Sequence, residues 1–199
     1  MKKYLIATMV SIGLTTAALA DSVTLDAAHK EDQKVVGKDN NVIGLAYATK
    51  APLGFGKDLT VEVRVEDEMI VDVTPKKHEG LVQAKASYEV GKYNVFLPVT
   101  PYVAAAVGLK SKSDSNFNYY VAEVGAKTTV QGVGVKLASR LRTPFNEGSV
   151  GTGNKYRTVE NSVTASYGLT KSLSVAVKYA EEHGDSAYNT TGVSLTRSF

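Results

Sequence analysis

Hydrophobic and polar residues alternate along most of the chain after residue 21. In a β-strand, successive side chains point to opposite faces, so this alternation predicts strands with one apolar face. Ten segments show the pattern: 22–30, 41–50, 58–68, 80–90, 99–111, 117–130, 133–142, 156–168, 172–182 and 187–199. Each is close to the roughly 9 to 11 residues that a tilted strand needs to cross a bilayer. The sequence therefore predicts an all-β fold.

The two faces of these segments differ strongly in chemistry. In segment 58–68, Leu59, Val61 and Val63 share one face, whereas Glu62 and Arg64 share the other. A soluble β-sandwich shows the same alternation, with its charged face in water. Alternation alone therefore leaves two architectures open, a soluble sandwich and a membrane barrel.

The connections between the segments alternate in kind. Long or charged connections follow every odd-numbered segment: 30–40, 67–79, 111–116, 143–155 and 183–186. Compact, mostly glycine-containing connections follow the even-numbered segments: 51–57, 91–98, 131–132 and 168–171. Long loops at one end and short turns at the other are typical of outer-membrane barrels. This asymmetry favours the membrane barrel.

Residues 1–20 have the pattern of a cleaved signal peptide. Lys2 and Lys3 precede an apolar stretch over 4–14, and Ala18 and Ala20 form a small-residue cleavage site. The alternative is an anchor helix, but the apolar stretch is too short for about 30 Å of hydrocarbon. We therefore expect an exported protein that begins at Asp21 and has one barrel domain over 21–199.

Composition narrows the possible partners. The chain has no cysteine, so no disulfide framework is expected in the exported protein. Removing the two signal-peptide lysines lowers the formal charge from +3 to +1. A nearly neutral chain gives no basis for nucleic-acid binding.

Three stretches resemble a known family. The run from Ser162 to Tyr179 is similar to the penultimate hairpin of small Gram-negative outer-membrane barrels of the porin-like and OmpA-like type. The ending from Gly192 to Phe199 is similar to the carboxy-terminal signal that barrel-assembly machinery reads in that family. Arg197 departs from it, because the family usually has an aromatic or aliphatic residue there. A third match, Thr100 to Leu109, resembles a strand opening common in these barrels.

The resemblance implies a closed antiparallel transmembrane β-barrel in the outer membrane. The ten alternating segments predict about ten strands, with eight as the alternative. The resemblance also implies contact with outer-membrane lipid and lipopolysaccharide, and assembly by the barrel-assembly machinery. Within the ending, Gly192, Val193, Leu195 and Phe199 correspond to the assembly signal.

Aromatic residues gather towards both ends of the predicted strands. Tyr47, Tyr102 and Tyr167 lie near the short-turn ends, and Phe117 and Tyr119 lie near the other ends. Amphipathic rings favour membrane interfaces, so we interpret these residues as two girdles on the outer surface. The alternative is that tyrosine simply favours strands.

Inward faces of the predicted strands carry many ionisable residues. The candidates are Asp26, Glu62, Arg64, Glu66, Lys85, Glu89, Glu123, Lys127, Lys136, Arg140, Arg142, Glu160 and Lys178. Acids dominate segment 58–68 and bases dominate 133–142, and these segments lie almost opposite on a ten-strand ring. Facing acidic and basic walls can set the charge preference of a pore. Alternatively, these groups pair across a narrow interior and plug it, and both interpretations stay open.

Candidate catalytic residues are few. His29, His78 and His183 are the only histidines, and none is spaced to form a metal site or a catalytic group with another. Some barrels of this family are hydrolases with Asp/His or Ser/His groups at the outer rim, but no motif here matches them. We therefore expect no catalytic residue, metal or cofactor.

The favoured function is slow diffusion of small polar solutes. The alternatives are a non-conducting barrel whose loops bind an unknown surface partner and, more weakly, a hydrolase at the outer rim.

Overall fold

The computed structural model describes residues 21–34, 39–54, 57–71, 77–94, 96–111, 116–145 and 157–199. The signal peptide predicted over 1–20 lies outside this part of the chain, as do its cleavage residues Ala18 and Ala20. The strands are β1 (Ser22–Asp32), β2 (Asp39–Gly54), β3 (Lys57–Ile70), β4 (Lys77–Glu89), β5 (Tyr93–Asn94), β6 (Pro98–Ser111), β7 (Asn116–Val130), β8 (Val133–Pro144), β9 (Thr158–Gly168), β10 (Leu173–Gly184) and β11 (Tyr188–Ser198).

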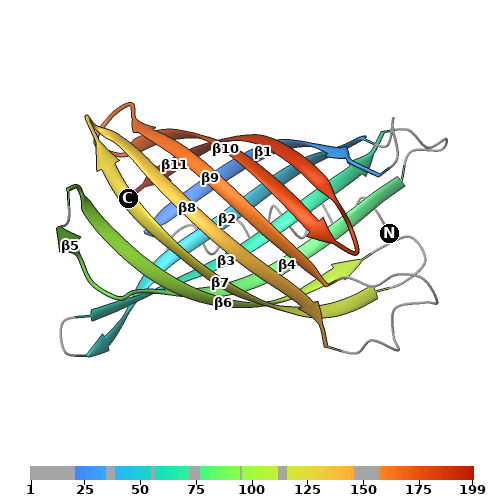
Figure 1. Ribbon diagram of the computed structural model, residues 1–199, viewed down its shortest axis with the longest axis horizontal. Helices are drawn as coiled ribbons and strands as arrows, with labels where there is room; N and C mark the ends of the chain where they lie inside the picture. Colours follow the sequence, from blue (N-terminus) through green and yellow to red (C-terminus); the bar gives the residue numbers. More distant parts are fainter. Residues whose placement is uncertain are drawn as a thin grey trace.

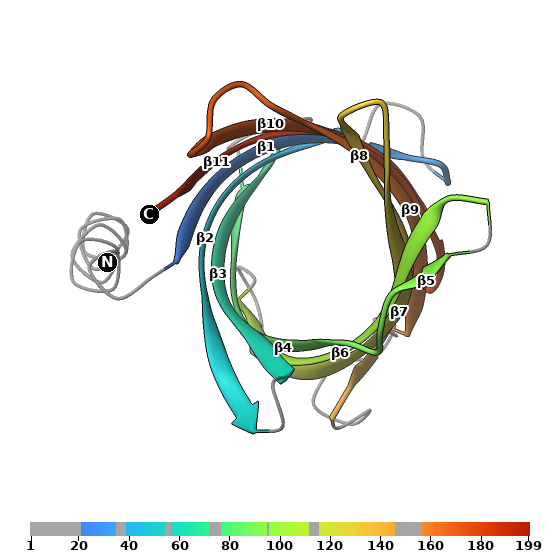
Figure 2. The same ribbon diagram turned by 90° about the vertical axis from the view of Figure 1, so that its left-hand side faces the viewer.

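Ten of these strands form one closed antiparallel barrel (Figure 1 and Figure 2). Neighbours along the chain pair with each other, β4 pairs with β6, and β1 closes the ring by pairing with β11 from Ser22↔Ser198 to Asp32↔Tyr188. The two-residue strand β5 pairs only with the start of β6. The predicted all-β barrel of ten strands is therefore confirmed. A closed ring has no unpaired edge, which is what a sheet needs in hydrocarbon.

The connections emerge at two ends. We call the end with connections 33–38, 71–76, 112–115, 145–157 and 185–187 the loop end. The other end, with connections 55–56, 90–97, 131–132 and 169–172, is the turn end. The connection over 90–97 is longer than the other turns because it contains β5. Among the described residues there is no helix of the length and apolarity that a membrane crossing needs.

The outer wall is apolar. Ile43, Val124 and Leu137 have more than half of their surface exposed, and similar aliphatic side chains cover the outward face of every barrel strand. Glu68, Glu123 and Glu160 are buried inside instead. A soluble sandwich buries its aliphatic face, so this reversed arrangement excludes the sandwich and fits a barrel surrounded by lipid.

Three aromatic residues contradict the prediction of outer girdles. Tyr102, Phe117 and Tyr119 are buried in the interior, and Tyr119 has no exposed surface. The inward position of Tyr102 cannot be read from the sequence, because Ala104, Ala105 and Ala106 follow it and a run of alanines does not show which face is apolar. Other members of the predicted girdles, such as Tyr167, do lie on the outer surface.

The buried tyrosines pack over glycines on neighbouring strands. Tyr119 on β7 is in register with Gly108 on β6, and a Cβ at Gly108 would lie 2.4 Å from the Tyr119 ring. The ring can therefore cross β6 and donate a hydrogen bond from its hydroxyl to Gln83 Oε1 on β4, at 3.2 Å. Together with Phe117, Val121 and Ala106, Tyr119 forms a packed cluster against β4, β6 and β7. One side of the interior is therefore filled by side chains.

Candidate functional site: the charged lumen

An acidic cluster lies on the wall formed by β1 and β3. Arg64 Nη1 lies 2.9 Å from Asp26 Oδ2 and 3.4 Å from Glu66 Oε1, and its Nε lies 3.3 Å from Glu62 Oε1. Gly44 on β2 is in register with both Asp26 and Glu66, so no side chain separates the groups on β1 and β3. Three carboxylates surround one guanidinium, which leaves an excess of two negative charges.

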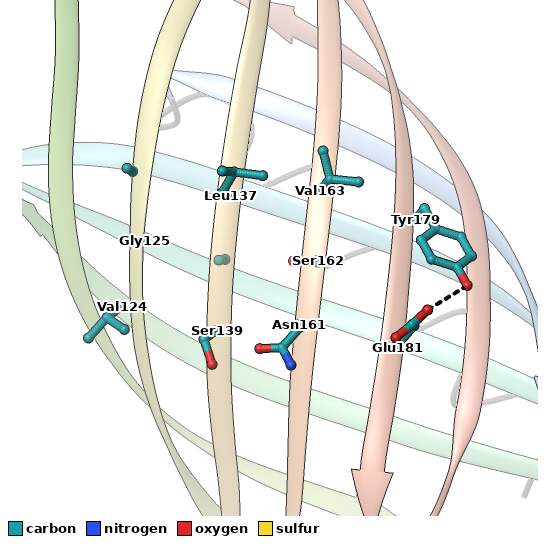
Figure 3. A pocket seen from close by; sticks show the side chains of 11 residues that line it. Val124, Gly125, Leu137, Ser139, Asn161, Ser162, Val163, Tyr179 and Glu181 are labelled. Atoms are coloured by element: carbon teal, nitrogen blue, oxygen red, sulfur yellow. Dashed lines mark hydrogen bonds between the residues drawn. The ribbon is translucent and has the colours of Figure 1, made fainter.

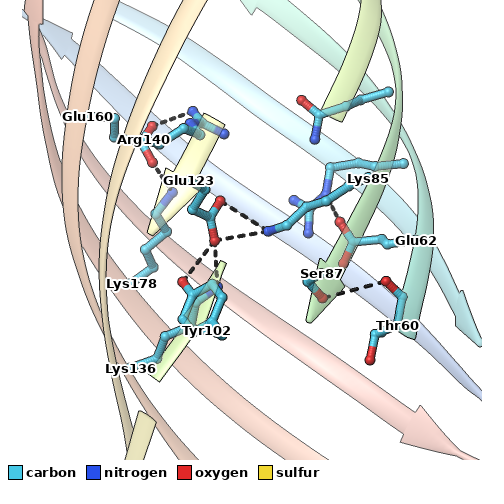
Figure 4. A network of polar contacts seen from close by, with 12 residues as sticks. Thr60, Glu62, Lys85, Ser87, Tyr102, Glu123, Lys136, Arg140, Glu160 and Lys178 are labelled. Carbon is cyan, nitrogen blue, oxygen red and sulfur yellow. Dashed lines mark hydrogen bonds and ion pairs between the residues drawn. The ribbon is translucent and has the colours of Figure 1, made fainter. Parts of the chain in front are cut away.

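A second cluster is centred on Glu123 of β7 (Figure 4). Lys85 Nζ from β4 lies 3.0 Å from both carboxylate oxygens, and Lys136 Nζ from β8 lies 3.3 Å from Oε1. The Tyr102 hydroxyl donates to the same oxygen at 2.8 Å. The Tyr102 ring passes over Gly125, where a Cβ would lie 2.5 Å from it. Two ammonium groups share one buried carboxylate, so this cluster carries one excess positive charge.

Glu160 of β9 organises a third cluster, also visible in Figure 4. Arg140 Nη2 from β8 lies 2.6 Å from Glu160 Oε2, and Lys178 Nζ from β10 lies 2.7 Å from Oε1. This cluster also carries one excess positive charge. The acidic cluster on β1 and β3 therefore lies opposite two clusters of positive excess on β7 to β10, one of which is completed by Lys85 of β4, in register with Glu62.

The loop end of the lumen contains neutral networks that the sequence prediction did not include. Glu68 accepts from Lys30 at 3.2 Å, from Lys110 at 2.8 Å and from the Asn40 amide at 2.9 Å. Lys110 also lies 2.9 Å from Glu79. The same alternation that identified Glu62 and Glu66 would have found Glu68, because it lies on the same face of β3.

The remaining predicted lumen residues lie at the two ends. Arg142 Nη1 lies 4.0 Å from Glu182 Oε2 towards the loop end, and the Arg142 guanidinium lies 5.4 Å from the centre of the Tyr119 ring. Lys127 Nζ lies 2.7 Å from Glu89 Oε1 at the turn end, where both side chains are about half exposed. The predicted acidic face of β3 and basic face of β8 are therefore brought into one interior, but each basic residue of β8 lies beside a carboxylate of a nearby strand.

The ion pairs follow the wall. Among the described residues, every salt bridge joins groups on the same strand, on adjacent strands or on strands separated by one other strand. None joins strands on opposite sides of the ring within that part of the chain. The salt bridges of the described residues therefore connect nearby strands, while Glu66 on β3 and Arg140 on β8 are close enough across the lumen to interact electrostatically.

Exposure differs along the interior. The side chains of Lys136, Lys178 and Arg64 retain 36%, 37% and 27% of their surface, whereas Glu68 and Lys110 at the loop end retain only 9% and 12%. Small hydroxyl residues line the inner face of β9 to β11 towards the turn end: Ser162, Thr164, Ser166, Ser174, Ser194 and Thr196. The middle and the turn end of the lumen are therefore accessible on this side, and the loop end is more tightly packed.

The histidines lie on the outer surface near the loop end. His78 Nδ1 lies 3.1 Å from Asp67 Oδ2, His29 Nε2 lies 3.8 Å from Asp39, and His183 Nε2 lies 3.7 Å from Glu181. No group of three or more His, Asp or Glu side chains in the described ranges is arranged to hold a metal ion.

The predicted assembly signal occupies the closing strand β11. Val193 and Leu195 point outwards, and Gly192 faces the interior. Phe199 is largely exposed, and its backbone N–H donates to the Asp21 carbonyl at 3.0 Å. The Arg197 guanidinium lies 5.3 Å from the centre of the Phe199 ring. The role of these residues in assembly stays a prediction.

Comparison with solved structures finds outer-membrane proteins, and the first of those described here shares the fold. An outer membrane channel from Pseudomonas putida F1 is 9% identical, with a TM-score of 0.57 over 90% of this chain and 96% of that chain. The NanC porin is 11% identical, with a TM-score of 0.48 over 88% and 100% of the two chains. An outer membrane phospholipase from Salmonella typhi is 10% identical, with a TM-score of 0.48 over 89% and 90%. No protein-family model and no curated protein sequence matches the chain. At these identities, the channel likeness shows a common fold and nothing further.

Proposed function

We propose that the protein is an integral outer-membrane barrel that lets ions and small polar solutes diffuse slowly through a narrow, charged lumen. The apolar outer wall and the fold shared with an outer-membrane channel support this location. The signal peptide expected from the sequence supports export. We propose no enzymatic activity, cofactor or nucleic-acid partner for it.

The main observation behind the pore proposal is that the salt bridges of the described residues join nearby strands and none crosses the ring. A salt bridge across the ring would obstruct passage, whereas pairs between strands that are adjacent or one strand apart stay on one side of the ring. Arg64, Lys136 and Lys178 each have a carboxylate partner and still retain more than a quarter of their side-chain surface. Charged groups that stay accessible inside a barrel offer a polar path to a hydrated solute.

The distribution of charge supports a transverse field. The cluster of Asp26, Glu62, Glu66 and Arg64 has a negative excess, and the clusters around Glu123 and Glu160 have a positive excess. Opposed walls of this kind orient dipolar solutes and set ion preference. Only small solutes fit, because a barrel of about eight strands is already filled by its side chains and ten strands are only slightly wider.

Single-channel recording tests the proposal directly. Protein refolded in detergent and added to a planar bilayer should give discrete current steps in potassium chloride. Electrophoresis in SDS provides the control for folding, because a closed barrel should migrate differently before and after boiling. A correctly folded sample without current steps would support the alternative, a non-conducting barrel that acts through its surface loops.

A hydrolase at the outer rim gains no support from the outward Ser139 and His183. Ser139 is an outward hydroxyl, and His183 is an outward histidine. The register aligns His183 with Val159, and Val159 with Leu141, so Ser139 is two strands away and also displaced along β8. Strands are about 4.8 Å apart, so two strands place these groups roughly 10 Å apart. A base has to approach its nucleophile to about 3 Å.

A further inference from the structure

Two lysines face each other inside the barrel beside a two-residue turn. The hairpin of β7 and β8 closes over Gln131 and Gly132, whose φ values are 50° and 81°. Two successive residues with positive φ form the tight turn that matches the twist of a β-hairpin and fixes its register. That register places Lys127 of β7 directly opposite Lys136 of β8, at the turn end of the lumen.

The opposite face of this hairpin forms part of the outer wall. Leu137, the residue after Lys136, lines a shallow depression on the outside of the barrel (Figure 3). Successive residues of a strand point to opposite faces, so the lysine side chain points into the lumen, as Figure 4 also shows. Lys127 has the same inward orientation, because it reaches the ring of the buried Tyr102.

Like charges that lie directly opposite each other on a sheet are destabilising. The ammonium groups of Lys127 and Lys136 lie 5.3 Å and 5.0 Å from the centre of the same Tyr102 ring. Lys85 is also close enough to repel Lys136 electrostatically. The face of one aromatic ring attracts a cation only weakly at an accessible site. The ring therefore offsets a small part of the repulsion within this pair.

The carboxylate nearest to Lys136 is shared with other donors. Glu123 accepts from Lys85 at 3.0 Å on both oxygens and from the Tyr102 hydroxyl at 2.8 Å. Lys136 lies 3.3 Å from one of these oxygens, which makes it the most distant of the three donors. Glu123 therefore neutralises Lys136 only in part.

The carboxylate beside the other lysine is exposed. Glu89 Oε1 lies 2.7 Å from Lys127 Nζ, and both side chains are about half exposed at the turn end. Exposed ion pairs are weak because water competes for both groups. The three lysines and two glutamates of this region leave one positive charge in excess. Each of the two opposed ammonium groups also has more N–H donors than its one carboxylate partner takes up.

Neutral donors extend the lysine pair on both sides. Thr100 of β6 is in register with the lysine of β7, and Thr164 of β9 is in register with the lysine of β8. Neither hydroxyl makes a hydrogen bond with another described group. Nearer the turn, the next inward pair is Thr129 and Gly134, which leaves room for a solute to approach. A row of four donors therefore crosses β6 to β9.

We propose that the row of Thr100, Lys127, Lys136 and Thr164 binds the phosphate group of a small solute, either inorganic phosphate or a phosphate ester. A tetrahedral oxyanion offers acceptor oxygens to both ammonium groups and to the hydroxyls beside them. Its negative charge offsets the repulsion between the lysines. A neutral sugar or amide could accept the same hydrogen bonds but would leave that repulsion in place.

This inference rests on the proposed function, because the solute has to enter the lumen, and it names one class of solute. Binding at equilibrium needs no current, so the two proposals can fail separately. A barrel that binds phosphate and gives no current steps contradicts the pore and supports the site. A barrel that conducts and does not bind phosphate contradicts the site alone.

A ³¹P NMR titration of the refolded full chain, in phosphorus-free detergent at constant ionic strength, tests the site. Inorganic phosphate and glycerol 3-phosphate are the probes, and the wild type should bind at least one of them saturably. Lys127→Gln/Lys136→Gln should weaken binding by at least about tenfold, because one charge-assisted hydrogen bond contributes about that factor. The matched Lys92→Gln/Lys171→Gln variant removes the same charge from two exposed turn-end connections and should bind as the wild type does.

The absence of saturable binding by the wild type would overturn the proposal. Unchanged binding by Lys127→Gln/Lys136→Gln would do so as well, and so would an equal loss in the matched variant, since net charge alone would then attract the anion. The SDS mobility of unboiled samples checks folding. Lys127→Gln alone, which breaks only an exposed pair, repeats the test if the double variant does not fold. Tighter binding of glycerol 3-phosphate would identify a phosphate ester as the solute, and tighter binding of inorganic phosphate would identify the free anion; both results support the site.

Discussion

At the scale of single residues, the interior depends on pairs formed by a small residue and a long one. Tyr119 reaches Gln83 only because Gly108 has no side chain, and Tyr102 reaches Glu123 over Gly125. Gly44 similarly leaves the acidic cluster of β1 and β3 continuous. Gly108 and Gly125 keep the filled side of the lumen compact, and Gly44 leaves room for the charged groups of β1 and β3.

Replacing Gly108 with alanine should therefore destabilise the barrel. The new Cβ would lie 2.4 Å from the Tyr119 ring, so the ring has to move and lose its bond to Gln83. Overpacking of this kind costs about 1–3 kcal/mol. Urea unfolding in detergent micelles measures the difference. Gly168→Ala, at an exposed glycine whose Cβ would meet nothing closer than 3.7 Å, should have little effect. Equal stability of the two variants would contradict this packing.

We expect the buried carboxylate of Glu123 to stabilise the fold more than an exposed carboxylate does. Glu123→Gln leaves Lys85 without its carboxylate partner and removes the charge beside Lys136. Breaking a buried pair costs about 3–5 kcal/mol, and partial exposure of Lys136 places the expected loss near the lower value. Glu89→Gln breaks the exposed pair with Lys127 and should cost no more than about 1 kcal/mol. Thermal unfolding of both variants compares them, and a similar loss in each would argue against a buried network.

Alternation in the sequence identified which residues face inwards but not how they pair. Glu62, Arg64 and Glu66 follow the period of β3, so their common face could be predicted. The partners of Glu123 come from β4 and β8, and finding them requires the register between strands. The prediction placed Tyr102 on the outer surface, because the alanines after it do not show which face of the strand is apolar. It placed Tyr119 there as well, because Tyr120 beside it fits the outer face equally well.

At the scale of elements, β11 closes the barrel. It pairs with β10 along one edge and with β1 along the other, over its whole length. Its apolar alternation and the resemblance of its ending were visible in the sequence, because both are local. The two-residue strand β5 was not predicted, since it is too short to show a period.

Deleting Phe199 should lower the amount of folded protein in the outer membrane of cells. The deletion removes a large exposed aromatic side chain and the N–H that bonds to Asp21 at the seam with β1. Quantifying the heat-modifiable band in outer-membrane fractions measures the effect. Arg197→Tyr, which restores the usual family residue, should be neutral or increase the yield. Normal levels after the deletion would refute the assembly role.

At the scale of the whole molecule, closure of the ring brings residues from strands far apart in the sequence into one interior site. β3 and β8 are far apart in the sequence, and only the order of strands around the ring sets the acidic cluster of β3 against the positive clusters centred on Glu123 of β7 and Glu160 of β9. The interior is also uneven, with a packed side at β4 to β7 and small hydroxyl residues at β9 to β11. The sequence could not distinguish a plug from a pore, because that depends on whether ion pairs follow the wall or cross it.

The reversal potential in a potassium chloride gradient, measured for the wild type and for Arg140→Glu, tests the conducting, charged lumen most directly. Arg140 contacts Glu160 in the positive wall, so reversing its charge should leave a conducting pore and shift its preference towards cations. Arg197→Glu changes the net charge equally on the outer surface and should leave the reversal potential unchanged. Loss of thermal stability in Arg140→Glu, with no current in either protein, would contradict the account and indicate a closed structural barrel.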